Sequence, residues 1–320
     1  MYTRHYSPPP LEGLSREADQ GWGEGSAPPL ATFAHAPPPG PLLQGEGENR
    51  ATSALARSAR GPAITTMPAV LLLLALFVAG VPALAQTPRE IIAGADTVRN
   101  PGQPFRATDT LTEYVSGKPK DQDQLVVYAK EDPATHQFRN LVRYVEPPRD
   151  AGKMALFDNR NLWFYDPSSK ASVRISPQQR LIGQAAIGDV LTVNLVVDYA
   201  GTLLGDETIT DAEHQQRTCW HLDLKAVTDT AIYNRVEYWV EHGSFHPVKA
   251  KFYSDSGRLL KILYYRGYRE QLGAVRPSEA IIIDAVDSSL VTSIAFGDQR
   301  FQDIPEAWFQ RDYLPRLRAE

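Results

Sequence analysis

Hydrophobic and polar residues alternate along most of the chain between residues 105 and 296, which is typical of strands with one buried face. The alternation is clear at 231–241, where Val236 and Tyr238 share one face of the predicted strand and Glu237 lies on the other. Clusters of Gly, Pro, Asn, Asp and Ser interrupt the pattern and separate the strands. The predicted strands cover residues 105–116, 122–130, 137–146, 153–157, 161–165, 171–176, 218–227, 231–241, 247–254, 258–268, 278–286 and 289–296.

Apolar residues stand on both sides of the strands around 259–265 and 281–283, so these strands need cover on two faces. A curved antiparallel sheet wrapped over a few helices would provide that cover. A helix is predicted at 88–98, because Pro88 opens it and an Asn-Pro pair ends it. A second helix is predicted at 304–314, near the end of the chain.

Residues 178–210 interrupt the strand pattern with apolar clusters that have no period of two. They predict a partly mobile, mainly helical insertion with a helix from Val190 to about Tyr199. Glycines inside the insertion are its predicted hinges: Gly183, Gly188, Gly201 and Gly205.

The first 66 residues have a different composition, with 10 prolines and 8 glycines in low-complexity runs. Such a segment cannot bury a core, so 1–66 is predicted to be disordered and is interpreted as a wrongly assigned N-terminus. Translation is expected to start at Met67 or slightly upstream.

Residues 67–85 have the layout of a secretory signal peptide. The apolar run at 69–81 is too short for a membrane span, which needs about 20 residues. The small residues Ala83 and Ala85 suit cleavage before Gln86, and the single cysteine of the chain, Cys219, lies far from this site. We therefore expect a periplasmic protein without a lipid anchor, in which residues 86–320 form a single domain.

The charge of the chain is close to balanced, with 33 Lys and Arg against 38 Asp and Glu. This balance argues against a nucleic-acid partner. With one cysteine, the chain can form neither an intrachain disulfide nor a cysteine-based zinc cluster, and its stability must come from an ordinary hydrophobic core.

The candidate reactive groups have simpler interpretations than catalysis. His242 and His246 are four residues apart, but Gly243 lies between them and predicts a hairpin turn instead of a metal-binding helix. Cys219 and His221 share a strand face, although no third group that would orient a thiol–imidazole pair is apparent. No nucleophile elbow, phosphate loop or zinc-protease motif occurs within 86–320. We predict no catalytic residue, no metal, no cofactor and no enzymatic activity.

Residues 161–167 (Asn-Leu-Trp-Phe-Tyr-Asp-Pro) closely resemble a segment of the periplasmic lipoprotein carriers of the Lol pathway. Residues 145–152 and 174–180, and the predicted hairpin at 238–250, are similar to the LolA-like outer membrane lipoprotein-sorting proteins. In the central loop, residues 183–189 depart from the family's usual Gly-Ser/Thr-Asp-Phe stretch.

This resemblance implies a mainly β fold, an incomplete antiparallel β-barrel of about eleven strands covered by short helices. It also implies an apolar cavity for the acyl chains of lipoproteins or lipids, with an inner-membrane transporter and an outer-membrane acceptor as partners. The expected function is a periplasmic carrier that sorts or transports such cargo toward the outer membrane. Two alternatives stay open: a non-carrier interaction or signalling module of the same fold that partners an export transporter, and a hydrolase.

The cavity lining is predicted from the more apolar face of each strand, although the sequence does not establish which face is the cavity. The predicted lining residues are Leu125, Val127, Val142, Tyr144, Met154, Leu156, Leu162, Phe164, Val236, Tyr238, Phe252, Leu263 and Ile294. The insertion is the predicted lid, because its apolar side chains could plug an empty cavity. Its predicted plug residues are Val190, Leu191, Val193, Leu195 and Val197.

Overall fold

The computed structural model describes residues 86–317. The predicted disordered segment at 1–66 and the predicted signal peptide at 67–85 lie outside the described residues. The helical elements are α2 (Pro88–Arg99), η1 (Ile187–Val190), α3 (Leu195–Asp198), η2 (Glu306–Phe309) and η3 (Arg311–Arg316). The strands are β1 (Phe105–Val115), β2 (Lys118–Glu131), β3 (Phe138–Glu146), β4 (Met154–Phe157), β5 (Leu162–Asp166), β6 (Ala171–Ile175), β7 (Arg180–Ile182), β8 (Ala185–Ala186), β9 (Tyr199–Thr210), β10 (Gln216–Ala226), β11 (Arg235–Glu241), β12 (Pro247–Tyr253), β13 (Leu259–Arg266), β14 (Arg269–Gln271), β15 (Ala274–Arg276), β16 (Glu279–Asp284) and β17 (Leu290–Phe301).

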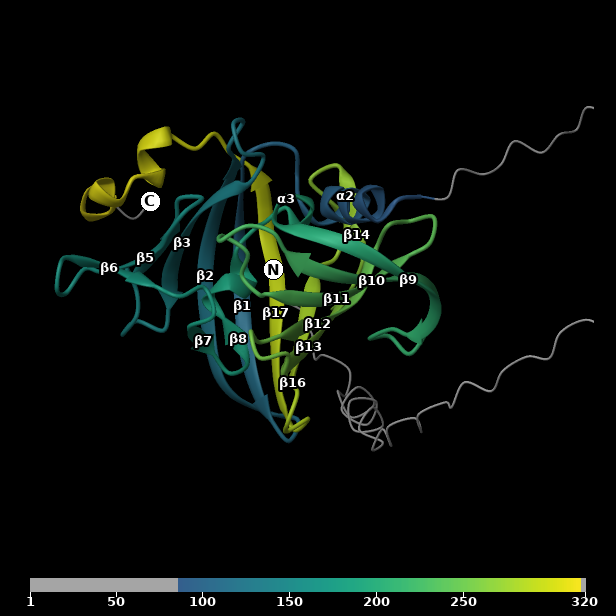
Figure 1. The fold of residues 1–320 in the computed structure, drawn as a ribbon. Coiled ribbons are helices and arrows are strands. Elements are labelled where there is room, and N and C mark those ends of the chain that lie inside the picture. The colour runs from purple at the N-terminus through teal and green to yellow at the C-terminus, as the bar shows by residue number, and fades with distance from the viewer. Residues whose placement is uncertain (1–85, 318–320) are drawn as a thin grey trace, which may run out of the picture. The chain divides into compact units, whose positions relative to one another are not determined.

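Thirteen of these strands form one antiparallel sheet in the order β6-β5-β4-β3-β2-β1-β17-β16-β13-β12-β11-β10-β9. In Figure 1, β2–β6 lie on one side of the central pair β1 and β17, and β9–β13 lie on the other. The sheet is open, with β6 and β9 at its edges, so the described strands form an incomplete barrel as predicted. Two short hairpins, β7-β8 and β14-β15, pair separately.

All twelve predicted strands are present, and their ends differ from the predicted ends by a few residues. The prediction was wrong for 199–210, which forms strand β9 and is not part of a helical insertion. This strand was missed because it is an edge strand with few buried side chains, and even Leu204 is 54% exposed. Its pairing with β10 along its whole length fixes its conformation.

The predicted helices were only partly correct. Helix α2 is present, whereas the helix predicted at 190–199 is reduced to the short η1 and α3, with extended backbone between them. The closing helix predicted at 304–314 is two 3₁₀ segments, η2 and η3. The longest described helix, α2, has 12 residues, and none in the described chain has the length and apolar content that crossing a membrane requires.

The two faces of the sheet are covered by different parts of the chain. The inner face, which carries Leu125, Val236 and Ile294, is covered by α2 and by residues 187–198. The outer face of β2–β5 is covered by the C-terminal segment through Ile304, Phe309 and Leu314. Each fully buried side chain of this size contributes roughly 1.5–3 kcal/mol. The β2–β5 half of the sheet is therefore buried on both faces.

Helix α2 begins with a capping box. The Thr87 Oγ1 atom accepts a hydrogen bond from the Glu90 backbone N–H at 3.3 Å, and the Thr87 N–H donates to Glu90 Oε2 at 2.8 Å. Ile91 and Ile92 face the core and hold the helix against the sheet. The last turn of the helix is thereby placed beside the 187–198 segment (Figure 1).

Candidate ligand-binding cavity

Two small cavities lie between the inner face of the sheet and residues 187–198. The larger measures about 110 Å³ and the smaller about 60 Å³. Ligand sites in proteins usually measure roughly 300–1,000 Å³. The space inside this sheet is therefore almost filled by the protein's own side chains. Residues shared by both cavities are Arg99, Asp189, Leu191, Leu263 and Tyr265.

The 187–198 segment supplies most of this filling. Val190, Leu191, Val193 and Leu195 are all buried and belong to the same hydrophobic cluster as the inner face of the sheet. Val197, the fifth predicted plug residue, is half-buried and lies outside that cluster. The apolar side of the segment thus occupies the place that the sequence predicted for an acyl chain.

Most of the predicted lining residues lie together on the inner face. Tyr144 and Phe252 pack against the cluster while staying half-buried, and the Phe164 ring meets the Tyr144 ring edge-on at 6.0 Å. The lining residues inside the buried cluster are Leu125, Val127, Val142, Leu162, Val236, Tyr238, Leu263 and Ile294. Those that border at least one of the two cavities are Val127, Val236, Tyr238, Phe252 and Leu263.

Met154 and Leu156 lie elsewhere, and their placement corrects the prediction. Both belong to the outer-face cluster, where they pack with the C-terminal segment. On β4, Ala155 and Phe157 point to the inner face instead. The alternation of β4 could not reveal this, because all four of its residues are buried.

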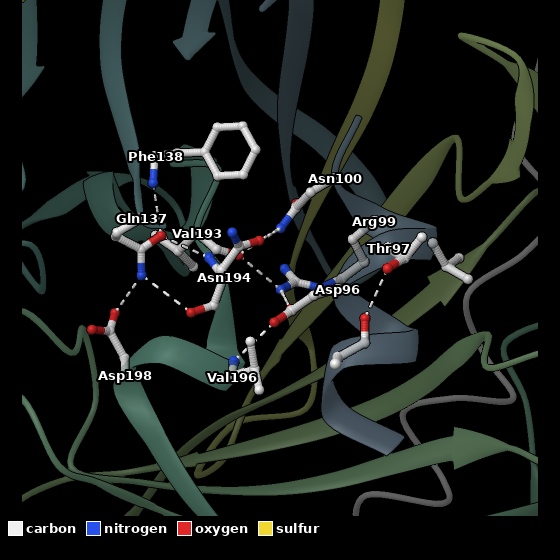
Figure 2. A network of polar contacts seen from close by, with 12 residues as sticks. Asp96, Thr97, Arg99, Asn100, Gln137, Phe138, Val193, Asn194, Val196 and Asp198 are labelled. Atoms are coloured by element: carbon white, nitrogen blue, oxygen red, sulfur yellow. Dashed lines mark hydrogen bonds and ion pairs between the residues drawn. The ribbon is translucent and has the colours of Figure 1, made fainter. Parts of the chain in front are cut away.

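The last turn of α2 is bonded to the 187–198 segment (Figure 2). The Asp96 Oδ2 atom accepts a hydrogen bond from the Val196 N–H at 2.8 Å. Arg99 Nη2 donates to Asp96 Oδ1 at 2.6 Å and to the Val193 carbonyl at 3.0 Å. Burial raises the pKa of Asp96, and the neighbouring Arg99 opposes part of that shift. This pair holds the segment from one side.

Two further side chains, Gln137 just before β3 and Asn140 on β3, bond to the 187–198 segment from a second side. Gln137 Oε1 accepts from the Asn194 N–H at 2.7 Å, as Figure 2 shows. Asn140 forms a two-way contact with Thr192: its Nδ2 donates to the Thr192 carbonyl and its Oδ1 accepts from the Thr192 N–H, both at 2.9 Å. Through these bonds the extended backbone between η1 and α3 has polar partners although it is not part of a helix.

Asp189 anchors the start of the segment. Its Oδ1 accepts from the Tyr233 hydroxyl at 2.8 Å, its Oδ2 accepts from the Ala186 N–H at 2.7 Å, and it forms a buried ion pair with Lys261. The Lys261 ammonium also lies over the rings of Tyr233 and Phe252, at 5.0 and 5.7 Å. Burial raises the pKa of the Tyr233 hydroxyl well above its usual value.

Three of the predicted hinge glycines, Gly183, Gly188 and Gly201, are sites of close packing. A Cβ atom at Gly188 would lie 2.7 Å from Ile232, and one at Gly183 would lie 2.3 Å from Thr292. Gly183 also has a φ of +52°, which other residues rarely adopt. In this arrangement, with the 187–198 segment packed against the inner face (the closed state), a Cβ atom at any of the three would be too close to a neighbouring side chain.

Asp109 was missed by the sequence analysis, although a signal was present. Alternation along β1 places Asp109 on the same face as Phe105, Ala107 and Leu111, which is the inner face. Its side chain borders the larger cavity and is 3% exposed. Burial raises its pKa to about 7.

The residues considered for catalysis or metal binding have structural partners. His242 pairs with Asp206 at 3.1 Å, and the His246 ring stacks on Tyr268. Cys219 is buried, and burial raises its pKa to about 12, so its thiolate is disfavoured. His221 stacks on the Trp239 ring. Among the described residues, no cluster of three or more His, Cys, Asp or Glu could hold a metal ion.

Comparisons with known proteins agree with this architecture. A family model described only as an uncharacterized protein matches residues 136–316. The fold is similar to an outer membrane lipoprotein-sorting protein domain from Vibrio parahaemolyticus, with 19% identity, coverage of 72% of this chain and 98% of that one, and a TM-score of 0.60. It is also similar to a DUF1329 family protein from Desulfovibrio piger, with 18% identity, coverage of 71% and 97%, and a TM-score of 0.60. At these identities the two structures show the fold alone.

No curated protein is significantly similar to the sequence. A LolA superfamily protein from Nitrosomonas europaea is 32% identical, with a TM-score of 0.64. The match covers 72% of this chain and 100% of that one. Because the similarity in sequence and in structure extends over the whole of that relative, this chain belongs to the LolA superfamily.

Proposed function

We propose that the protein is a periplasmic carrier, exported through a cleaved signal peptide, that binds the acyl chains of lipoproteins or other acylated lipids. It would sort or transport them toward the outer membrane, between an inner-membrane transporter and an outer-membrane acceptor. The observation that carries this proposal is the burial of Val190, Leu191, Val193 and Leu195 against the inner face of the sheet. Superfamily membership and the lipoprotein-sorting description of one structural neighbour support it.

The closed arrangement favours reversible binding. An acyl chain gains about 0.8 kcal/mol for each buried CH₂ group, but it must first displace apolar side chains that occupy the same surface. Displacement also breaks the hydrogen bonds of Thr192, Val193 and Asn194 described above. The net free energy of binding is the gain from burying the acyl chain minus the cost of displacing the segment. Because these two quantities are similar, cargo can be handed to an acceptor.

Native mass spectrometry of gently purified protein tests the carrier function. We expect a fraction of the protein to retain a non-covalently bound acyl lipid, which organic extraction removes. An interior without lipid, together with a stable complex with another protein, would instead favour the interaction or signalling module.

Amide exchange tests whether the segment is displaced. On loading with lipid, we expect exchange to become faster across residues 190–199, because cargo takes the place of their buried side chains. The strands between 231 and 254 should keep their protection, because they form the wall of the cavity. Equal exchange of 190–199 with and without lipid would mean that the segment is fixed core.

Replacing Asn140 with alanine should raise the affinity for a fluorescent fatty-acyl probe about tenfold. The substitution removes both hydrogen bonds to Thr192 and weakens the closed state by roughly 1–3 kcal/mol, and 1.4 kcal/mol corresponds to a factor of ten. Asn234→Ala is the control, because Asn234 is exposed and its side chain bonds, within the described residues, to Asp255 in another turn. An Asn140→Ala protein that is less stable but binds the probe as the wild type does would contradict the displacement mechanism.

A further inference from the structure

Asp109 is a carboxylic acid in an apolar part of the inner face. Its strand neighbours in register are Leu125 on β2 and Phe296 on β17. Within residues 86–317, its buried Oδ1 atom has no hydrogen-bond partner. A buried acceptor without a partner costs roughly 1–3 kcal/mol, and nearly all buried polar groups in native proteins have a partner in the protein, in water or in a ligand. The side chain borders the larger cavity, so a ligand there can reach it.

The other charged groups that line this cavity have partners of their own. Arg99 bonds through Nη2 to Asp96 and to the Val193 carbonyl, while its Nε has no partner among the described residues. Arg276 donates to the carbonyls of Thr97 and Val98 at the end of α2, at 3.0 and 2.8 Å. Asp189 is paired with Lys261, as described above. Asp109 therefore carries the unpartnered acceptor of this lining, and Arg99 Nε is an unpartnered donor in it. A ligand donor would complete Asp109.

The charges around the cavity restrict what that ligand group can be. A ligand cation would share the cavity with the two guanidinium groups of Arg99 and Arg276. Above pH 7, where Asp109 is ionised, a ligand anion would place a second acceptor beside the Asp109 carboxylate and would be repelled by it. A neutral donor satisfies the orphan oxygen without adding charge to a buried site. The rest of the lining includes Val127, Leu263 and Phe296, which suit a hydrocarbon chain.

We propose that the larger cavity recognises a neutral hydrogen-bond donor, a hydroxyl or an amide N–H, that the acyl ligand carries and that donates to Asp109. This inference rests on the proposed carrier function and narrows its ligand class to hydroxylated or amide-bearing acyl chains. The raised pKa of Asp109 agrees with a buried site that disfavours charge. The competing explanation is an ordered water, because a cavity of about 110 Å³ has room for several.

The experiment compares two probes with the same hydrocarbon chain, tetradecanamide and methyl tetradecanoate, of which only the amide has a donor. Each displaces a fluorescent fatty-acyl probe from the delipidated mature protein at pH 8, where Asp109 is ionised and can only accept. We expect the amide to bind about tenfold more tightly than the ester, the factor that corresponds to one hydrogen bond to a group otherwise left unpaired. In Asp109→Leu the ratio should fall to near one, and in Asp109→Asn, which keeps an acceptor oxygen, the preference should persist.

The outcomes separate this inference from the function on which it rests. Equal affinities of the wild type for the two probes would overturn the inference, would favour water as the partner of Asp109, and would leave the carrier function intact. Binding of neither probe would overturn both. If Asp109→Leu still prefers the amide over the ester, the amide N–H donates to another residue and the inference is overturned. The comparison of amide and ester affinities in the wild type tests the inference even if a variant fails to fold.

Discussion

Replacing Lys261 with methionine is expected to lower the free energy of unfolding by about 3–5 kcal/mol, because it leaves the Asp189 carboxylate buried without its cation. Both side chains are almost fully buried, at 7% exposure for Lys261 and 2% for Asp189. The Tyr233 hydroxyl and the Ala186 N–H remain as partners of Asp189, but neither carries a compensating charge. The start of the 187–198 segment would lose its anchor as well.

Urea unfolding followed by tryptophan fluorescence measures this loss. Lys153→Met is the matched control, because Lys153 also contacts an aspartate, Asp150 at 2.6 Å, but both side chains are about a quarter exposed. Exposed pairs contribute at most about 1 kcal/mol, so the control should lose no more than that. Combining Lys261→Met with Asp189→Leu should recover much of the stability. A Lys261→Met loss as small as the control's would show that the ion pair does not stabilise the closed state.

The strands could be predicted because burial of one sheet face imposes a period of two on the sequence. The same reasoning failed at β4. Met154 and Leu156 pack against the C-terminal segment on the outer face, and Ala155 belongs to the hydrophobic cluster of the inner face. When both faces are covered, alternation is lost and nothing local identifies the cavity side. It also failed at β9, whose edge position leaves residues such as Leu203 and Leu204 exposed.

The 187–198 segment shows a different limit. Its apolar side chains were predicted to plug the interior, and the structure places most of them there. Its conformation was predicted as one helix, yet only the short η1 and α3 form and the backbone between them is extended. Gln137 and Asn140 bond to this extended part, and Asp96 bonds to α3. These partners are roughly 50–100 residues away in sequence, so no local pattern could reveal them. Asp109 differs, because the alternation of β1 alone places it on the apolar face.

Asp109 should also make the stability of the protein depend on pH. Its pKa is raised from 3.8 to about 7 in the folded state, so between these values the folded chain holds a proton that the unfolded chain has released. Stability must then fall as pH rises from about 4 to 7, and the full cost is present above pH 7. Asp109→Leu removes both this titration and the orphan acceptor, and should therefore stabilise the protein at every pH in this range.

The gain in stability from Asp109→Leu should be about 2–3 kcal/mol larger at pH 8 than at pH 5. Between these pH values the folded wild type loses a proton that the unfolded chain has already released, and this costs about 1.4 kcal/mol for each pH step of one below the folded pKa. Burial also raises the pKa of Asp123 to about 6, but this group is present in both proteins and cancels in the difference. Urea unfolding of the wild type and the variant at the two pH values measures the effect. A gain that is the same at pH 5 and pH 8 would mean that Asp109 titrates as an ordinary carboxylate, with a partner that the folded protein provides.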